Sequence, residues 1–412
     1  MRLHLQNIGP LREAAIDLAH DLILLTGPNG TGKTFAAYCV YDAGYVWNIK
    51  KMPQISFTKN ITAENLTAEG DFDKIFIDNI DAYANALTEN LPNLFAQKPK
   101  QSDENAKISF EISEEDVKIL QNNNLAGENA FYTFSINNNT FIYTINEKYY
   151  LDKLVLNVPF WLNLFHLNVN SHHIFPVARV VLTSHFQSLK PENDSNLLPR
   201  YPKPVRDHLE MLNDMINLSK NTSELAYLAD WLETELLKGK IVMSQYGELR
   251  YKPTGDKKNY SISTSASVTQ SLASLVFYFR HLAKAGDRII IDEPELNLHP
   301  DNQRIIARFL VRAMNAGVRI LISTHSDHLI RELNDLIMLG SKQDTKAAKA
   351  LMREFKYKKE DLLDHKKVGV YLFEGNGCTE LAVSETGFEV ATIDAVIMQS
   401  NEQSDAIYNA LF

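Results

Sequence analysis

The most informative segment of this chain is Leu22-Ile-Leu-Leu-Thr-Gly-Pro-Asn-Gly-Thr-Gly-Lys-Thr34. Leu22 to Leu25 form a continuous apolar run, as expected for a strand that is buried on both faces of a sheet. The residues that follow match the pattern G-x-x-x-x-G-K-[ST], which binds the phosphates of a nucleotide. The sequence therefore predicts a buried strand that leads directly into a phosphate-binding loop.

The residue types in this loop explain its chemistry. The glycines allow successive backbone N–H groups to turn toward a β-phosphate. Lys33 would contact the β- and γ-phosphate oxygens, the hydroxyl of Thr34 would bind Mg²⁺, and a helix from about Phe35 would add its positive dipole end. ATP and Mg²⁺ are therefore the expected ligands. The expected nucleotide-binding residues are Gly27, Pro28, Asn29, Gly30, Thr31, Gly32, Lys33, Thr34 and Phe35.

The composition is that of a cytoplasmic enzyme with two or three domains. The chain has 412 residues, of which 45% are hydrophobic and 23% are charged, and this is enough for a substantial core. Cys39 and Cys378 are too few for a disulfide framework, and neither a signal peptide nor a membrane-spanning run is expected. The formal net charge of −9 argues against a protein coated in nucleic acid, but it is compatible with a local basic surface.

A second apolar run ends in acidic residues, in the sequence Arg288-Ile-Ile-Ile-Asp-Glu-Pro-Glu-Leu-Asn-Leu-His-Pro300. A buried strand here would point Asp292 toward the phosphates, where its carboxylate would hold Mg²⁺ through water. Glu293 would then orient the attacking water. The alternative is a simple acidic cap ahead of a helix. The functional interpretation is favoured because the phosphate loop requires a metal partner of this form.

A third apolar strand, in Val318-Arg-Ile-Leu-Ile-Ser-Thr-His-Ser-Asp327, ends in a polar cluster. A lone histidine is more often structural than catalytic. His325, however, lies at the tip of a strand that is expected to share a parallel sheet with the acidic strand, so its side chain would face the same edge. We expect His325 to contact a γ-phosphate.

These motifs resemble those of a known family. Gly27–Thr34 looks like a Walker A motif, Ile291–Pro300 like a Walker B motif followed by a D-loop, and Ser323–Ser326 like a switch-histidine segment. Together they resemble the motifs of OLD-family and RecF/SMC-like ABC ATPases. The resemblance covers the two ends of the ATPase domain and leaves 60–170 undescribed.

The resemblance implies a fold and a biological setting. The implied fold is α/β, a P-loop NTPase of ABC-ATPase type with a mixed central sheet, an inserted α+β region and a helical segment. Asn297 and His299 would be D-loop residues. Similar AAA family ATPases occur in bacterial anti-phage systems such as PARIS, Septu and retron-associated operons. In these systems ATP drives dimerisation of the heads, and a nuclease or another effector carries the toxic step.

The family also has a signature segment that reaches the ATP of the other subunit, and the candidate here is Ser263-Thr-Ser-Ala-Ser-Val-Thr-Gln-Ser-Leu272. It departs from the Leu-Ser-Gly-Gly form. Hydroxyl groups at a helix N-terminus can still bind a γ-phosphate together with the helix N–H groups, so Ser265 and Ser267 are the expected residues in trans. The alternative is a serine N-cap without a catalytic role. No Q-loop glutamine is assigned, with Gln54 as a candidate.

The late position of the acidic strand indicates that a large insertion separates two halves of one nucleotide-binding domain. Within the insertion, Asp71 to Phe95 predicts an amphipathic helix, and Leu154 to Leu167 is an apolar segment that would pack in a core or bind a partner. The expected segments are an N-terminal lobe with Walker A (1–58), an inserted α+β region (59–170), linking strands with a helical lobe (171–260), the signature, Walker B, D-loop and switch histidine (261–340), and a C-terminal basic helix with a hairpin tail (341–412).

Three local patterns complete the expected structure. Arg2 to Ile8 alternates like an edge strand, Ile174 to Arg179 predicts a strand that ends in an arginine, and 240–252 predicts a hairpin. Lys346 to Lys359 predicts a basic helix, which is either a solvated face or a surface for DNA or an acidic partner. Val370–Gly375 imitates the first strand of a TOPRIM nuclease. No later Asp-x-Asp pair follows it, so we expect no nuclease here and interpret Glu374 as a hairpin residue.

The sequence therefore predicts an ATP-hydrolysing ABC-type ATPase. By the resemblance, it would form a homodimer or higher homo-oligomer through ATP-bound heads and act as sensor or motor for a separate effector in anti-phage defence. An alternative function is that of a RecF/SMC-like DNA-binding ATPase in DNA repair. A transporter's motor subunit is disfavoured by the altered signature and the large insertion.

Overall fold

Strand β3 (Leu22–Thr26) is buried at every position, because parallel strands flank both of its edges and side chains cover both of its faces. It lies in a nine-stranded mixed sheet of order β10-β14-β15-β3-β16-β17-β2-β1-β6. The first five strands run parallel, and the α/β fold with a mixed central sheet is confirmed. The computed structural model describes residues 1–44, 58–61, 66–96, 105–111, 126–128, 132–137, 140–145, 171–184, 201–244 and 247–412.

Besides the central sheet, the described residues form a three-stranded and a five-stranded antiparallel sheet, of orders β11-β12-β13 and β4-β5-β9-β8-β7. The bounds of the strands are β1 Arg2–Ile8, β2 Leu11–Asp17, β4 Thr58–Ile61, β5 Leu66–Asp71, β6 Lys107–Glu111, β7 Ala126–Glu128, β8 Tyr132–Asn137, β9 Thr140–Ile145, β10 His172–Phe175, β11 Gly239–Met243, β12 Leu249–Pro253, β13 Tyr260–Ser261, β14 Arg288–Asp292, β15 Arg319–Ser323, β16 Val368–Glu374 and β17 Gly377–Leu381.

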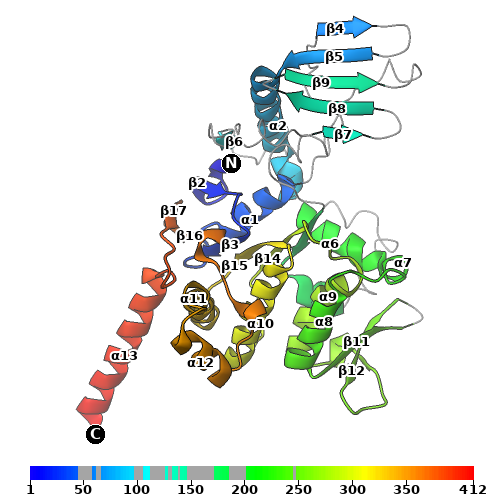
Figure 1. The fold of residues 1–412 in the computed structure, drawn as a ribbon. Coiled ribbons are helices and arrows are strands. Elements are labelled where there is room, and N and C mark those ends of the chain that lie inside the picture. Colours follow the sequence, from blue (N-terminus) through cyan, green and yellow to red (C-terminus); the bar gives the residue numbers. More distant parts are fainter. Residues whose placement is uncertain are drawn as a thin grey trace.

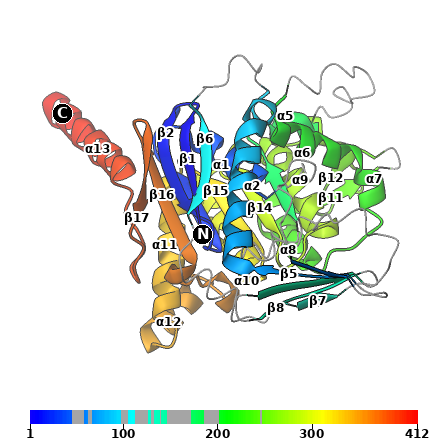
Figure 2. The same ribbon diagram turned by 90° about the horizontal axis from the view of Figure 1, so that it is seen from above.

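Helices cover the sheet, as Figures 1 and 2 show. Their bounds are α1 Lys33–Asp42, α2 Phe72–Leu94, α5 Arg179–Ser184, α6 Lys203–Asn213, α7 Met215–Leu218, α8 Ala226–Leu232 with a π-helix over Glu233–Leu237, α9 Ser267–His281, α10 Pro300–Asn315, α11 Asp327–Ser341, α12 Lys346–Glu354 and α13 Ala391–Leu411.

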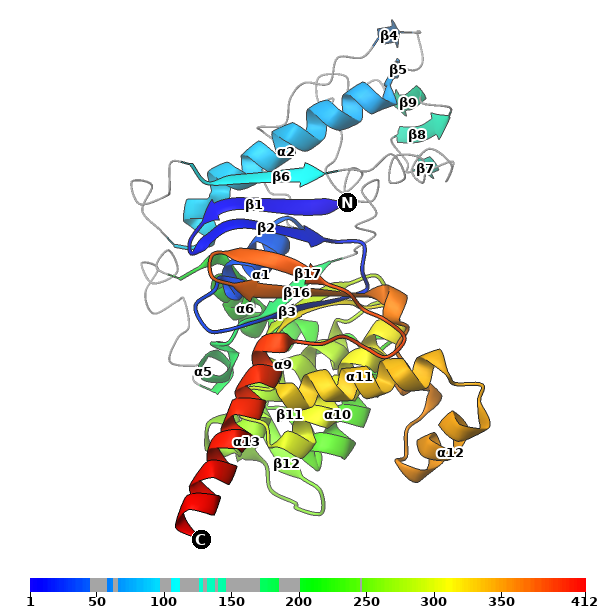
Figure 3. The ribbon, with the colours of Figure 1, turned by 90° about the vertical axis from the view of Figure 1, so that its left-hand side faces the viewer.

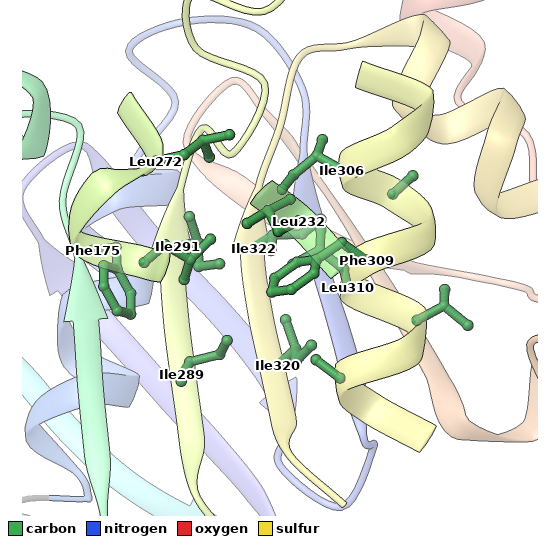
Figure 4. Close-up of a cluster of buried hydrophobic side chains, with 14 of the residues drawn as sticks. Phe175, Leu232, Leu272, Ile289, Ile291, Ile306, Phe309, Leu310, Ile320 and Ile322 are labelled. Carbon is green, nitrogen blue, oxygen red and sulfur yellow. The ribbon is translucent and has the colours of Figure 1, made fainter. Parts of the chain in front are cut away.

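Two apolar cores sandwich the parallel strands, because successive side chains of a strand point to opposite faces. Leu22 and Leu24 of β3 belong to a core shared with α8, α9, α10 and α11. Ile23 and Leu25 belong to the other core, with α1, α2, β1 and β2. Figure 4 shows the first core, where Phe309 of α10 lies against the strands. The continuous apolar runs in the sequence are explained by this double burial.

The inserted segment contributes to the central sheet as well as to a sheet of its own. The amphipathic helix α2 is confirmed, and Tyr83, Leu87 and Leu91 are buried in the second core. At the far end of α2 lies the five-stranded sheet (Figures 1 and 3). Strand β6 pairs with β1, so the expectation that β1 is an edge strand was wrong. The edge is provided by β6.

The C-terminal segment completes the sheet around the phosphate-loop strand. β16 pairs with β3 in parallel, and β17 returns as an antiparallel hairpin in which Glu374 lies opposite Gly377. The hairpin interpretation of Glu374 is therefore confirmed. The basic helix predicted over Lys346–Lys359 is α12, which ends earlier, at Glu354, and α13 extends away from the body (Figures 1 and 2).

Three further expectations need correction or placement. Helix α1 begins at Lys33 rather than near Phe35, so the lysine belongs to its first turn. The strand predicted to end at Arg179 ends at Phe175, and Arg179 instead begins α5, because Pro176 and a turn interrupt the strand. The hairpin over 240–252 is confirmed as β11 and β12. Gln54 and the segment Leu154–Leu167 lie outside the described residues.

The packing in Figure 4 generates a test of the core. Phe309 is fully buried, and its ring contacts Phe279 edge to face with centroids 4.9 Å apart. Phe309→Ala should lower the free energy of unfolding by about 3–5 kcal/mol, since it removes a buried ring and leaves a cavity. Chemical denaturation followed by circular dichroism would measure this. The exposed Phe355 provides the matched control, and equal losses for Phe309→Ala and Phe355→Ala would contradict the packing described here.

Candidate active site

The phosphate loop connects β3 to α1 through backbone conformations that glycine supplies. Gly27 has φ +124°, and a Cβ atom there would lie 2.1 Å from the carbonyl oxygen of Phe373 in β16. Gly32 has φ +99° and is the N-cap of α1. Positive φ values and close backbone approach both exclude larger side chains. Gly27 thus has a steric role against β16 and Gly32 one against Leu11, in addition to the expected role of both in the phosphate cradle.

Lys33 is folded back onto its own loop. Its Nζ donates hydrogen bonds to the carbonyl oxygens of Gly27 (2.9 Å) and Pro28 (2.7 Å), and the residue is 6% exposed. Burial lowers the pKa of Lys33, while the nearby carboxylates of Asp292, Glu293 and Glu295 oppose this shift. The ammonium group is therefore held at the centre of the loop by carbonyl oxygens that phosphate oxygens could replace.

Thr34 and Asp292 meet at the edge of the sheet, although they are far apart in sequence. The Thr34 hydroxyl donates to Oδ2 of Asp292 at 3.1 Å, and the Ser323 hydroxyl donates to Oδ1. Burial raises the pKa of Asp292 above its ordinary value, and these two hydrogen bonds oppose that shift. A hydroxyl and a buried carboxylate are hard oxygen ligands, so this pair fits the Mg²⁺ ion that a P-loop implies.

Glu293 and His325 form a second pair beside the first. Nε2 of His325 lies 3.5 Å from Oε1 of Glu293, and both side chains are about one-third exposed, at 32% and 30%. Hydrogen bonding by His325 is the main cause that lowers the pKa of Glu293, so the carboxylate is ionised and can accept a proton or a hydrogen bond from water. The structure thus brings together the four side chains that the sequence placed at three distant strand ends.

Glu295 is a half-buried residue with a buried carboxylate oxygen, and the sequence analysis did not single it out. Its Oε1 accepts hydrogen bonds from the Thr324 hydroxyl at 2.7 Å and from the backbone N–H of His325 at 2.8 Å. It fixes the segment that carries His325 against the turn that follows β14. The sequence held a signal for this role. A second acid in Glu293-Pro-Glu295, so close to a buried strand, indicates a carboxylate with hydrogen-bond partners in the protein.

The candidate signature residues lie at the start of α9. The Ser265 hydroxyl donates to the carbonyl oxygen of Ser261 at 2.7 Å, whereas Ser267 is exposed in the first turn of the helix. The N-cap position belongs to Ala266, whose side chain cannot cap. An N-cap role for Ser265 or Ser267 is therefore not observed, and the exposed helix start is compatible with contact to a second copy.

Both candidate D-loop residues are exposed between β14 and α10. Asn297 has φ +64°, which asparagine tolerates better than most residues. His299 is the N-cap of α10, and its Nδ1 accepts from the N–H of Asp301 at 3.3 Å. Both candidate D-loop residues therefore lie on the surface of the described structure.

Arg179 is the second residue that sequence analysis did not assign to the site. It is fully buried, and its guanidinium donates to the carbonyl oxygens of Asp292 (2.6 Å) and Glu293 (2.7 Å). Burial lowers its pKa to about 10, so the group remains charged at neutral pH. An arginine shortly after the apolar pair Ile174–Phe175 was the available signal, because arginine is rarely buried without partners.

Comparison with known proteins bears on the class of protein. A sequence model of the AAA ATPase domain matches residues 181–330, which contain Ser265, Asp292 and His325 but not the phosphate loop. The match spans less than half of the chain. No curated protein matches the chain significantly. Within the described residues, no helix is both long and apolar enough to cross a membrane.

Solved structures with a related arrangement include SMC heads. An SMC head bound to the C-winged helix domain of ScpA has 10% identity and a TM-score of 0.37, over 93% of this chain and 97% of that chain. The SMC head domain from Thermotoga maritima has 10% identity and a TM-score of 0.32, over 93% and 98%. An SMC head with an extended coiled coil, bound to the C-terminal domain of ScpA from Pyrococcus furiosus, has 10% identity and a TM-score of 0.34, over 97% and 98%.

Likenesses at this level of identity and superposition carry no conclusion about activity. The match to the AAA ATPase domain over residues 181–330 and the phosphate loop before α1 together support an ATPase domain of P-loop type.

Proposed function

We propose that this chain hydrolyses ATP with Mg²⁺, that two ATP-bound copies dimerise, and that the dimer controls a separate effector in anti-phage defence. One observation carries the catalytic part of the proposal. Thr34, Asp292, Glu293 and His325 come from three distant segments and gather at the carboxyl ends of the neighbouring strands β3, β14 and β15. This is the edge at which parallel α/β sheets bind ligands.

The proposed mechanism is mostly one of positioning. Lys33 and the loop N–H groups bind the β- and γ-phosphates, and Glu293 orients a water molecule for attack on the γ-phosphorus. His325 holds Glu293 and can contact the γ-phosphate from the same side. Thr34 and Asp292 would bind Mg²⁺, which when present neutralises negative charge on the phosphate oxygens.

Dimerisation is supported by two exposed segments, the start of α9 and the turn between β14 and α10. The start of α9, with Ser267, and the turn with Asn297 and His299 are exposed on the described surface. A helix N-terminus with hydroxyl groups binds phosphate. In the proposed dimer, Ser265 and Ser267 of one copy approach the nucleotide held by the phosphate loop of the other copy.

The effector and the defence role rest on the resemblance of the motifs to OLD-family ATPases. The discriminating experiment is affinity purification of the tagged chain in the presence of ATP, followed by mass spectrometry. A second protein recovered in fixed ratio with wild type, but not with Lys33→Ala, supports ATP-dependent control of an effector. Recovery of the chain alone argues against a separate effector.

A DNA-binding ATPase of RecF/SMC-like type is the second candidate, and the basic segment after α11 favours it. Lys346, Lys349 and Arg353 of α12 are exposed, with Lys366 and Lys367 further along the chain. Such a cluster attracts phosphate groups even on a protein of negative net charge. ATPase activity that rises with double-stranded DNA in the absence of any partner would support this function, and the stimulation should fall with added salt.

Mutation of Lys33 should impair ATP binding, whereas mutation of Glu293 should impair ATP hydrolysis. Lys33→Ala removes a charged phosphate contact and should weaken ATP binding by about 10–100-fold. Glu293→Gln keeps the phosphate contacts but loses the water-orienting carboxylate, so it should bind ATP normally, hydrolyse it at least about 100-fold more slowly, and accumulate as a dimer. Nucleotide titration, phosphate release and light scattering with ATP measure these effects. Identical behaviour of the two variants would contradict the assigned roles.

Asp292 should carry the Mg²⁺ dependence of ATP binding. Asp292→Asn keeps the shape but loses the charge, so ATP affinity with Mg²⁺ should fall to the value measured in EDTA. Because burial raises the pKa of Asp292, wild type should lose its Mg²⁺-dependent affinity at a higher pH than an exposed aspartate would. The control is Asp287→Asn. Asp287 is also buried, but it precedes the first residue of β14 and so lies at the end of the strand opposite Asp292. An unchanged Mg²⁺ effect in Asp292→Asn would exclude this ligand.

The composite site can be tested by complementation. A Lys33→Ala chain and a Ser265→Ala, Ser267→Ala chain should each be inactive alone, because each homodimer lacks one half of both sites. A forced heterodimer of the two should regain one complete site, with an ATPase rate clearly above that of either homodimer and at most about half of the wild-type rate. If forced pairing restores no activity, Ser265 and Ser267 do not act in trans.

A further inference from the structure

Arg179 joins two parts of the molecule that the proposed mechanism treats separately. Its Nη1 and Nη2 donate to the carbonyl oxygens of Asp292 and Glu293, while its Nε donates to the carbonyl oxygen of Ser271 in α9 at 3.2 Å. A further bond from Nη1 to Pro176 at 3.2 Å anchors the side chain to the end of β10. One buried guanidinium therefore connects the candidate signature helix to the peptide that carries the water-orienting carboxylate.

The peptide held by Arg179 is in an unusual conformation. Glu293 has φ +50°, which residues other than glycine rarely adopt. Such a conformation persists only where its surroundings fix it. Arg179 binds the carbonyl oxygens of Asp292 and Glu293, which lie before and after the backbone torsions of Glu293. In addition, the N–H of Glu293 donates to the carbonyl oxygen of Ser323 at 3.1 Å. The direction of the Glu293 side chain thus depends on the position of Arg179.

A second contact ties the same elements together. The hydroxyl of Ser271 donates to the carbonyl oxygen of Leu296 at 3.0 Å, and Ser271 is completely buried. The turn after β14 is thereby fastened to α9 at two points, through Arg179 and through Ser271. A displacement of α9 would move this turn, because close packing leaves no room for the two contacts to lengthen.

We propose that Arg179 is a positioning residue that couples the signature helix α9 to Glu293 of the same chain. When the start of α9 meets ATP bound by a second copy, the position of α9 sets the direction of Glu293 through the guanidinium. Hydrolysis at one site would then be fastest when α9 of the same chain also engages ATP at the other site. This inference rests on the proposed ATPase function and adds a regulatory link to it.

Arg179→Lys tests the proposal, because lysine keeps the charge but its compact ammonium cannot reach four carbonyl groups from three elements. We expect kcat to fall on the order of 10–100-fold, since small misplacement of a catalytic group has large effects on rate. The KM and the Kd for ATP should stay within about twofold of wild type. Ser271→Ala, a milder change at the second contact, should lower kcat in the same way but by less.

The matched control is Arg288→Lys. Arg288 is the other fully buried arginine of the described chain, and it lies at the opposite end of β14, where it donates to the carbonyl oxygen of Leu18. A merely structural role predicts that both lysine variants lower the melting temperature and activity alike. Positioning predicts that only Arg179→Lys separates kcat from KM.

Hydrogen exchange provides a readout that does not depend on activity. In Arg179→Lys, peptides covering 293–298 should exchange faster than in wild type, whereas peptides covering 27–34 should not change. The proposal is overturned if Arg179→Lys keeps kcat within about twofold, if it loses ATP affinity in proportion to kcat, or if Arg288→Lys shows the same loss of kcat. A wild type without ATPase activity would refute the proposed function instead, and the exchange data would still decide whether Arg179 fixes the Glu293 turn.

Discussion

The parallel pairing of β14, β15 and β3 is the constraint on which the site depends. In this register Asp292 lies opposite Ser323, and Ser323 lies opposite Leu25. The ladder continues one residue further, because the N–H of Thr324 donates to the carbonyl oxygen of Leu25. Backbone hydrogen bonds, rather than side-chain attraction, therefore bring the polar strand ends together. A shift by one residue would turn each of these side chains to the opposite face.

The charged groups at this edge already have partners in the protein. Lys33 is bonded to loop carbonyl oxygens, Asp292 to two hydroxyl groups, and Arg179 to backbone carbonyl oxygens. Buried charges without such partners would be very costly. Binding of a nucleotide can then proceed by exchange of partners, in which phosphate oxygens replace carbonyl oxygens around Lys33. These hydrogen bonds hold the charged groups in place, and such preorganisation reduces the reorganisation that catalysis requires.

Much of this site could be predicted because its elements leave strong local signals. A continuous apolar run before Gly27, and another before Asp292, are what strands buried on both faces require, and the end of each run places the polar residue. The relation between Asp292 and His325 followed from the expected parallel sheet. Each of these predictions concerned the end of a strand. The register of the sheet then determines how close the residues at neighbouring strand ends lie.

The remaining features depend on contacts that no local pattern encodes. Arg179 was read as the end of a strand, since nothing near it reveals that its partners are in α9 and after β14. Glu295 was seen only as part of a motif, although it braces His325. The pairing of β6 with β1 could not be read from Arg2–Ile8, because an edge strand and a strand covered by an insertion can show the same alternation.

The position of β16 has a consequence for how the protein is made. Val368 pairs with Leu22, and the carbonyl oxygen of Phe373 lies where Gly27 would carry a side chain. The strand before the phosphate loop is synthesised long before its neighbour β16. Contacts between such distant segments form slowly. Until β16 has been synthesised, one edge of β3 stays open to other chains or chaperones, and the strands beside the phosphate loop are incomplete.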